Sequence, residues 1–138
     1  MSAPDYTKAS LRIWGDDLVP EEISDLLGTK PSASERKGDA IVGKITKNKC
    51  IAKTGGWRLS APVNHDGDLD AQINELFAQL PTDTILWRDL ATKYRIDVFC
   101  GVFMKTGNVG IHFSAATLRL LGERGARLGL DIYDADDG

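Results

Sequence analysis

One segment of the sequence has the residue spacing of a nucleotide-binding loop. Gly38, Gly43 and Lys44 fit the pattern G-x-x-x-x-G-K, in which backbone amides cradle phosphates and the lysine reaches them. In such a loop the next residue is Ser or Thr, which holds Mg²⁺, but here it is Ile45. A buried strand must also precede the loop, whereas residues 32–37 are polar. We therefore predict no phosphate-binding loop.

Three aspartates at alternate positions match the start of a calcium-binding loop. In such a loop Asp66, Asp68 and Asp70 would supply oxygen ligands. The loop also needs glycine at its sixth position and glutamate at its twelfth, and this sequence has Ala71 and Phe77 there. We interpret Asp68 as a helix N-cap and Asp70 as a residue that complements the positive helix N-terminus. No metal or other cofactor is predicted.

The histidines and cysteines lack the spacing of a metal site or a catalytic pair. His65 lies in a polar loop, and His112 alternates with apolar residues, which predicts that its ring faces solvent. Cys50 and Cys100 form no C-x-x-C pair. Cys100 stands in an apolar run, where burial raises the pKa of a thiol and weakens it as a nucleophile. The sequence therefore predicts no catalytic residue and leans against an enzyme.

The strongest unusual feature is a basic segment at residues 36–58. It contains seven lysines and arginines and a single acid, so it carries +6 while the rest of the chain carries −9. A solvated hairpin edge, an acidic protein partner, a nucleic acid or a small anion would each account for it. Its candidate binding residues are Arg36, Lys37, Asp39, Lys47, Lys49, Trp57 and Arg58.

The three tryptophans are expected to lie mainly in the core. Trp14 shares one side of a predicted strand with Arg12, so we expect it to be half exposed. If Trp14 and Trp57 lie together, they would frame a pocket. Trp87 falls on the apolar side of a predicted helix.

Length and composition describe an ordinary globular chain. With 138 residues, 42% apolar and 27% charged, it fits a single domain over 1–138, with flexible ends at 1–8 and 134–138. Its net charge of −3 predicts no general attraction to nucleic acid or anionic lipid. We find neither the apolar core of a secretory signal nor a stretch long enough to cross a membrane. A cytoplasmic protein without a membrane partner is expected.

Hydrophobic periodicity and helix-end residues predict the elements that position these side chains. Helices are expected over residues 20–27, 68–80, 84–94 and 114–124. Strands are expected at residues 11–14, 41–45, 50–53, 57–60, 96–104, 109–113 and 128–132. Polar loops are expected at residues 32–38 and 61–67, and a tight turn at 106–108 would make a hairpin of the strands on either side of it.

The order of these elements predicts an α+β fold, with a mostly antiparallel sheet and helices packed mainly on one face. The strand at 96–104 is apolar on both sides, which places it inside the sheet. The first strand and helix resemble the pair at 109–113 and 114–124, since both helices carry Leu-Leu-Gly near their ends. This similarity suggests two ferredoxin-like halves.

Several short motifs resemble, in order and spacing, those of one family. They are Asp17-x-x-Pro20-Glu21-Glu22-Ile23-Ser24, Leu27-Gly28-x-x-Pro31, Arg36-Lys37-Gly38-Asp39, Gly56-Trp57-x-Leu59-Ser60, Asp97-x-Phe99-Cys100-Gly101 and Asp131-Ile132-Tyr133. Over nearly its whole length the chain resembles the family catalogued as domain of unknown function 4279. The resemblance implies a small, stand-alone bacterial domain of the cytosol and brings no established catalytic residues. By analogy, small bacterial families of this kind often include immunity proteins of toxin systems.

Three classes of function follow. The leading one is a non-enzymatic module that binds a protein, with an immunity or antitoxin-like role as its most concrete form. In it Lys44, Lys47, Lys49 and Lys53 steer an acidic partner that Trp57 and Arg58 anchor, or the acidic tail at 134–137 meets a basic toxin. The second is nucleic-acid binding through residues 36–58. The third is an enzyme with a small-molecule pocket near Arg36, Asp39, Trp57 and Asp97. The oligomeric state is left open.

Overall fold

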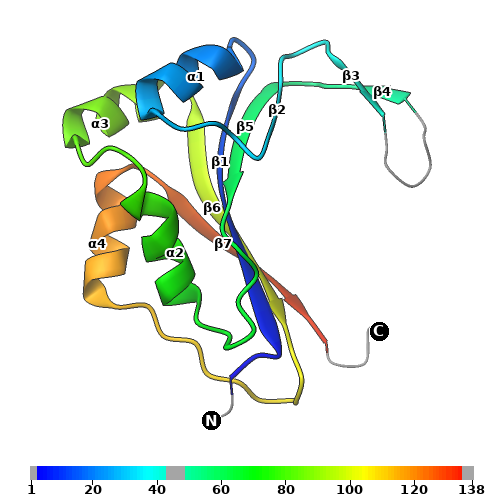
Figure 1. Ribbon diagram of the computed structural model, residues 1–138, viewed down its shortest axis with the longest axis vertical. Helices are drawn as coiled ribbons and strands as arrows, with labels where there is room; N and C mark the ends of the chain where they lie inside the picture. The colour runs from blue at the N-terminus through cyan, green and yellow to red at the C-terminus, as the bar shows by residue number, and fades with distance from the viewer. Residues whose placement is uncertain (1–2, 43–48, 135–138) are drawn as a thin grey trace.

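The computed structural model describes residues 3–42 and 49–134 and contains a five-stranded sheet in the order β2-β5-β1-β6-β7 (Figure 1). All neighbours in this sheet are antiparallel except β6 and β7, which are parallel. Two further strands pair only with each other and project from one end as a hairpin. The strands are β1 (Tyr6–Gly15), β2 (Ala33–Glu35), β3 (Ala40–Val42), β4 (Lys49–Ile51), β5 (Gly55–Ser60), β6 (Arg95–Phe103) and β7 (Arg127–Tyr133).

The helices lie where local sequence signals predict them. They are α1 (Pro20–Leu27), α2 (Leu69–Ala78), α3 (Thr84–Lys93) and α4 (Ala115–Glu123). Pro20 opens α1, and Gly28 ends it with a φ of 67° while its N–H donates to Ser24 O. Asp68 caps α2 by accepting from Ala71 N, and Ser114 caps α4 by accepting from Thr117 N. None of the helices in the described residues is long and apolar enough to cross a lipid bilayer.

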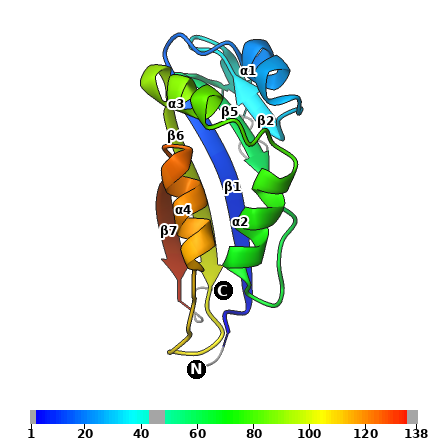
Figure 2. The same cartoon turned by 90° about the vertical axis from the view of Figure 1, so that its left-hand side faces the viewer.

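The helices cover one face of the sheet, as Figure 2 shows from the side of the helices. Alternate residues of β1, β5 and β6 point toward them and form the core, including Leu11, Ile13, Trp57 and Val98, each fully buried. The other face of these strands has no helix over it. The prediction of an α+β fold with a mostly antiparallel sheet is therefore confirmed, as is the position of β6 inside the sheet, between β1 and β7.

The strand predicted at residues 109–113 is wrong. These residues lie outside the strands, in the segment that leads from β6 to α4. Both sides of β6 are already paired, one with β1 and the other with β7, so a returning hairpin strand has no place beside it. Ile111 and Phe113 pack against the core from this segment, which accounts for their alternation. The comparison that suggested two ferredoxin-like halves rested on this strand and loses its support.

Two smaller expectations also need correction. Residues 33–35, expected in a loop, form β2 at the edge of the sheet. Residues 6–8, expected in a flexible end, belong to β1, and Thr7 is fully buried. Short edge strands and strand ends carry little hydrophobic periodicity, so the pattern gives no signal for them.

Candidate functional site

The face of the sheet without helices gathers side chains that are far apart in the sequence. We call it the open face. It consists of Ala33 and Glu35 of β2; Gly56, Arg58 and Ser60 of β5; Tyr6, Lys8, Ser10, Arg12 and Trp14 of β1; Arg95, Asp97, Phe99, Gly101 and Phe103 of β6; and Arg127, Gly129, Asp131 and Tyr133 of β7.

An ion pair lies at the middle of the open face. Arg12 of β1 and Asp97 of β6 are directly opposite in register and make two parallel hydrogen bonds, each 2.8 Å long. The bonds to Asp97 raise the pKa of the Arg12 guanidinium above its ordinary value. The same guanidinium lies 4.6 Å from the Trp14 ring centre and 4.5 Å from the Phe99 ring centre. Arg12 therefore holds two aromatic rings and one carboxylate in fixed positions.

A row of stacked aromatic rings crosses the open face where β1 begins and where β6 and β7 end. Tyr6, Phe103 and Tyr133 are neighbours in register on three adjacent strands. The ring centres are 4.2 Å apart in the first pair and 4.6 Å in the second, with the planes 8° from parallel in both. The Tyr133 hydroxyl donates to Asp131, which raises the pKa of the phenol. Phe103 is therefore covered on both ring faces, whereas Tyr133 is stacked on one face only.

The charges of the open face are unevenly neutralised. Its three acids all accept hydrogen bonds: Glu35 from Arg58, Asp97 from Arg12 and Asp131 from Tyr133. Three exposed cations, Lys8, Arg95 and Arg127, have no acidic partner within ion-pair distance in the described part of the chain. The face thus carries five cations against three acids, in a chain whose net charge is −3. The sign of its charge is therefore opposite to that of the whole chain.

A cavity of about 460 Å³ lies at the Trp14 end of the open face. Its wall is formed by Trp14, Gly15, Asp16, Thr54 and Arg95. Trp14 Nε1 is buried and, among the described residues, has no acceptor. The pKa of Asp16 is lowered, first by the hydrogen bond from Lys37 and then by one with Thr54. The attraction of Arg95 also lowers the pKa of Asp16, so the cavity combines an indole donor with one cation and one carboxylate that Lys37 pairs.

The loop that follows β2 holds three of the predicted binding residues. The Asp39 carboxylate accepts from the backbone N–H of Arg36 at 2.8 Å and closes the turn. Arg36 also pairs with Glu21 at 2.9 Å, and Lys37 with Asp16 at 3.2 Å. Both cations hold exposed acids of the chain itself and link this loop to α1 and to the end of β1.

Trp57 and Arg58 do not form one anchor, contrary to the prediction. Successive residues of β5 point to opposite faces, so Trp57 lies on the helix-covered side and Arg58 on the open face. Trp57 has no exposed surface, and its Nε1 donates to Ser24 Oγ at 3.0 Å. For the same reason Trp14 and Trp57 frame no pocket together. The expectation that Trp57 and Trp87 lie in the core is confirmed.

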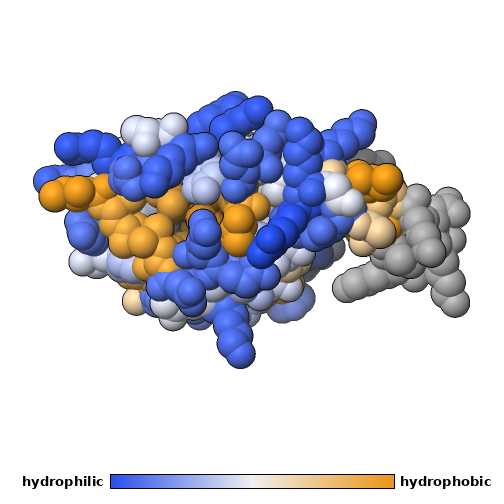
Figure 3. Space-filling model, turned by 90° about the horizontal axis from the view of Figure 1, so that it is seen from above, coloured by the Kyte–Doolittle hydropathy of each residue, from blue (hydrophilic) through white to orange (hydrophobic). Residues whose placement is uncertain are grey.

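The remaining predicted lysines are at positions 44, 47, 49 and 53. Lys44 and Lys47 lie outside the described residues, and only the backbone of Lys49 is described, in β4. Lys53 is exposed just beyond β4. Figure 3, which views the molecule from above, shows apolar surface at the end that carries β3 and β4. Ile51 of β4 is 69% exposed. Of the acidic tail, Asp134 is exposed and residues 135–138 lie outside the described range.

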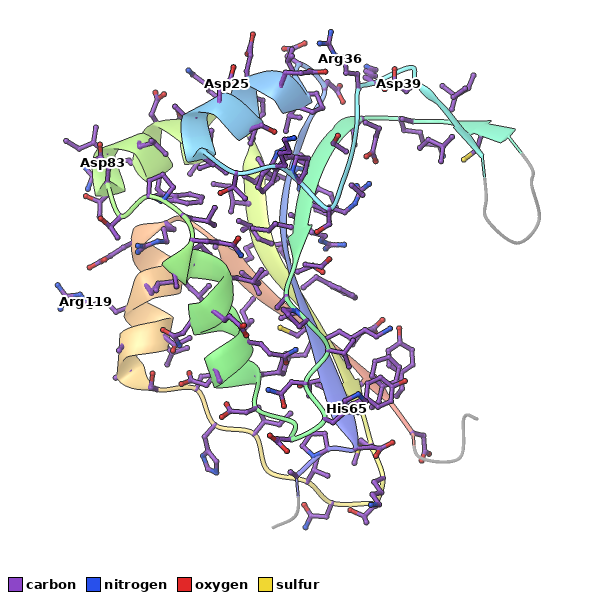
Figure 4. The ribbon with its side chains drawn as sticks, viewed as in Figure 1. Asp25, Arg36, Asp39, His65, Asp83 and Arg119 are labelled. Carbon is purple, nitrogen blue, oxygen red and sulfur yellow. The ribbon has the colours of Figure 1, made fainter. Side chains whose placement is uncertain are left out.

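The residues proposed for an enzyme pocket are not brought together. Arg36 and Asp39 lie near the hairpin, at the opposite end of the molecule from His65 (Figure 4). Trp57 is in the core, and Asp97 is bound to Arg12 on the open face. Within the described residues, no group of three or more histidine, cysteine or acidic side chains has the geometry of a metal site. The structure therefore does not bring these four residues into one pocket.

Cys100 is expected to be unreactive in the folded protein. Burial, reinforced by the nearby Asp97, raises the pKa of its thiol to about 12, so almost no thiolate exists at neutral pH. Cys50 is exposed. With a thiol reagent followed by mass spectrometry, we expect Cys50 to react at least ~100-fold faster than Cys100. Cys50→Ser should leave the native protein unlabelled, and labelling of that variant without denaturant would contradict the prediction.

The sequence did not reveal the open face as a site. Its individual strands show alternation, and Arg12 was placed beside Trp14, but the partners Arg12 and Asp97 are 85 residues apart. Only strand pairing brings them together. The one sequence signal that points to this face is the presence of charged and aromatic residues between apolar ones in β1 and β6.

Comparison with known proteins gives one match. A family model described as a domain of unknown function (DUF4279) matches residues 5–135. Neither the curated proteins nor the solved structures contain a significant match to the chain.

Proposed function

The chain belongs to the DUF4279 family, a family of unknown function, and from the geometry of its open face we propose that it is a non-enzymatic module that binds an acidic protein there. One observation carries the proposal: on this face every acid has a donor, while Lys8, Arg95 and Arg127 form no ion pair within 4.0 Å among the described residues. Unneutralised cations attract an oppositely charged surface and increase the rate of encounter.

The side chains between these cations suit a protein interface. Arginine and the large aromatic residues are the types most enriched among residues that dominate binding energy. Trp14, Phe99 and Arg12 pack together in the middle of the face, where the ion pair with Asp97 limits their motion. Side chains that are already ordered lose less entropy when a partner binds.

The same geometry favours a protein over a nucleic acid. Binding of single strands uses ring faces on which bases can stack. Here Phe103 has a ring stacked on either side, and Arg12 lies over both Trp14 and Phe99. Apart from the outer face of Tyr133, ring edges and guanidinium groups remain, and guanidinium groups suit carboxylates. The cavity beside Trp14, with its indole donor and Arg95, would accept an acidic side chain of the partner.

The immunity or antitoxin-like role suggested by the sequence is one form of this proposal, because such an inhibitor acts by binding a toxin without catalysis. In this form the open face would cover a complementary acidic surface of the toxin. Arg36 and Lys37 already pair with Glu21 and Asp16, so the contact would rest on the cations of the open face.

Charge reversal on the open face tests the proposal. We expect tagged protein to retain an acidic protein from lysate of its own cells at about 50 mM salt and to lose most of it near 300 mM. The double variant Lys8→Glu/Arg95→Glu should reduce recovery roughly 10-fold or more. The matched control, Lys30→Glu/Arg88→Glu, changes the net charge equally at exposed sites off the open face and should bind normally.

The outcomes separate the alternatives. Equal recovery by both variants would overturn the open face as the binding surface. Recovery of nucleic acid that disappears after nuclease treatment would instead support nucleic-acid binding. Once a partner is identified, its association rate with each variant at both salt concentrations should show the same difference.

A further inference from the structure

The outer strand β7 is an unprotected edge of the sheet. It pairs with β6 on one side, and no described strand pairs with its other side. Most edge strands are short or are blunted by proline, lysine or a bulge. The opposite edge, β2, has three residues, whereas β7 has seven and contains neither proline nor lysine. Leu130 and Ile132 of β7 are 43% and 59% exposed.

Along this edge, one hydrogen bond defines the phase of the strand, that is, which residues direct their backbone N–H and C=O groups toward β6 and which direct them outward. Tyr133 O accepts from Met104 N at 3.0 Å, so the polar backbone groups of Tyr133 point toward β6. In a strand, successive residues direct these groups to opposite sides. Leu128, Leu130 and Ile132 therefore direct their N–H and C=O groups away from the sheet. These are the residues whose side chains are apolar and point to the helix side, in register with Val98, Cys100 and Val102.

From this phase we propose that two copies of the chain pair antiparallel through β7, with the two Leu130 residues facing each other on a two-fold axis. In this register Leu130 pairs with itself and Leu128 with Ile132 of the second copy. Each of these is a pair in which both residues exchange N–H···O bonds. With the opposite phase, the two Leu130 residues would form a pair whose backbone groups make no hydrogen bonds to each other.

The side chains are complementary in the same register. On the helix side, all three cross-strand pairs are apolar, which would cover the exposed Leu130 and Ile132. On the open face, Arg127 faces Tyr133 of the second copy and lies diagonal to its Asp131. No like charges are opposite each other, and Gly129 leaves room for Asp131. A two-fold interface requires this kind of self-complementary surface, which a peptide of another protein has no reason to share.

The association state tests the proposal directly, without knowledge of any ligand. In sedimentation equilibrium from about 1 to 500 μM, we expect the average mass to rise toward that of a dimer. Leu130→Lys places two positive charges on the axis and should weaken dimerisation at least ~100-fold. Ile85→Lys, at a residue of α3 that is 72% exposed, is the matched control and should dimerise normally. Urea unfolding should show both variants folded.

Cross-linking gives a second readout. In a Cys50→Ser background, Leu130→Cys would bring two thiols together, because such pairs have Cα atoms about 5.5 Å apart, within disulfide range. We expect oxidation to produce a covalent dimer with this variant and not with Ile85→Cys. A protein that stays monomeric over the whole concentration range would overturn the proposal. So would a Leu130→Lys variant that dimerises as well as the parent, or equal cross-linking at residues 130 and 85.

Discussion

Replacing Trp57 by alanine is expected to lower the free energy of unfolding by about 3–5 kcal/mol. The indole is fully buried on the helix-covered side of β5, and its Nε1 donates to Ser24 Oγ of α1. The substitution removes a large apolar surface from the core, leaves a cavity and strands a hydroxyl that held α1 against the sheet. Domains of this size are stable by roughly 5–15 kcal/mol, so a large fraction of the total would be lost.

Trp14→Ala is the matched control, since it removes the same side chain from the adjacent strand but on the open face. There the ring is partly exposed and packs against Arg12, so we expect a loss of roughly 1 kcal/mol. Urea unfolding followed by circular dichroism measures both variants. Similar losses for the two would contradict the assignment of Trp57 to the core and Trp14 to the surface.

This difference in stability separates folding from binding. A variant such as Trp14→Ala that keeps the fold can report on the partner, whereas Trp57→Ala would weaken binding only by unfolding the protein. The sequence favoured Trp57 as an anchor because it stands next to Arg58. Two residues adjacent in a strand point to opposite faces, so their proximity in sequence argued against a shared surface.

Pairing through β7 would change the size of the proposed binding surface. Two sheets would become continuous across the two-fold axis, and their open faces would lie on the same side. Arg127, one of the cations without an acidic partner in the described residues, would lie at the seam. Dimerisation and binding of an acidic partner are separate claims, since the Lys8 and Arg95 variants leave β7 intact.

The helices could be predicted because their ends are encoded locally. Proline in the first turn, glycine with positive φ after α1, and the side chains of Asp68 and Ser114 act within a few residues of themselves. The fold class followed from the order of elements. These features depend on hydrogen bonds and hydrophobic periodicity over short distances.

The strand pairing and the binding surface could not be predicted in the same way. The alternation at 109–113 reflects the packing of Ile111 and Phe113 on the core. No strand forms there, because β7 occupies the position beside β6. The strands that pair with β1 are 40 or more residues away in the sequence, so the side of β1 that faces the core has no local signal. The Arg12–Asp97 pair therefore has no local signal in the sequence. The charge pattern instead predicted a binding surface at residues 36–58.

Gln72 shows the same limitation inside the core, since a glutamine on a helix is ordinarily expected at the surface. In the structure it is almost fully buried. Its Nε2 donates to Thr7 O at 3.0 Å and to Pro62 O at 2.9 Å, and its Oε1 accepts from Thr7 Oγ1 at 2.6 Å. One side chain thus joins α2 to β1 and to the segment after β5.

Gln72→Leu is expected to lower the free energy of unfolding by about 1–3 kcal/mol, because it leaves the Thr7 hydroxyl buried without a partner and removes the bond to the part-buried Pro62 carbonyl. The Thr7 carbonyl keeps the N–H of Asn64, which limits the loss. Thr7→Val alone should cost about 1–3 kcal/mol, since it strands Gln72 Oε1. In the double variant neither group of the Thr7–Gln72 pair remains. The free energy of unfolding that it loses should therefore be about 0.5–3 kcal/mol smaller than the sum of the losses of the two single variants. Urea unfolding of the four proteins measures this coupling, and strictly additive losses would show that the buried hydrogen bond contributes nothing.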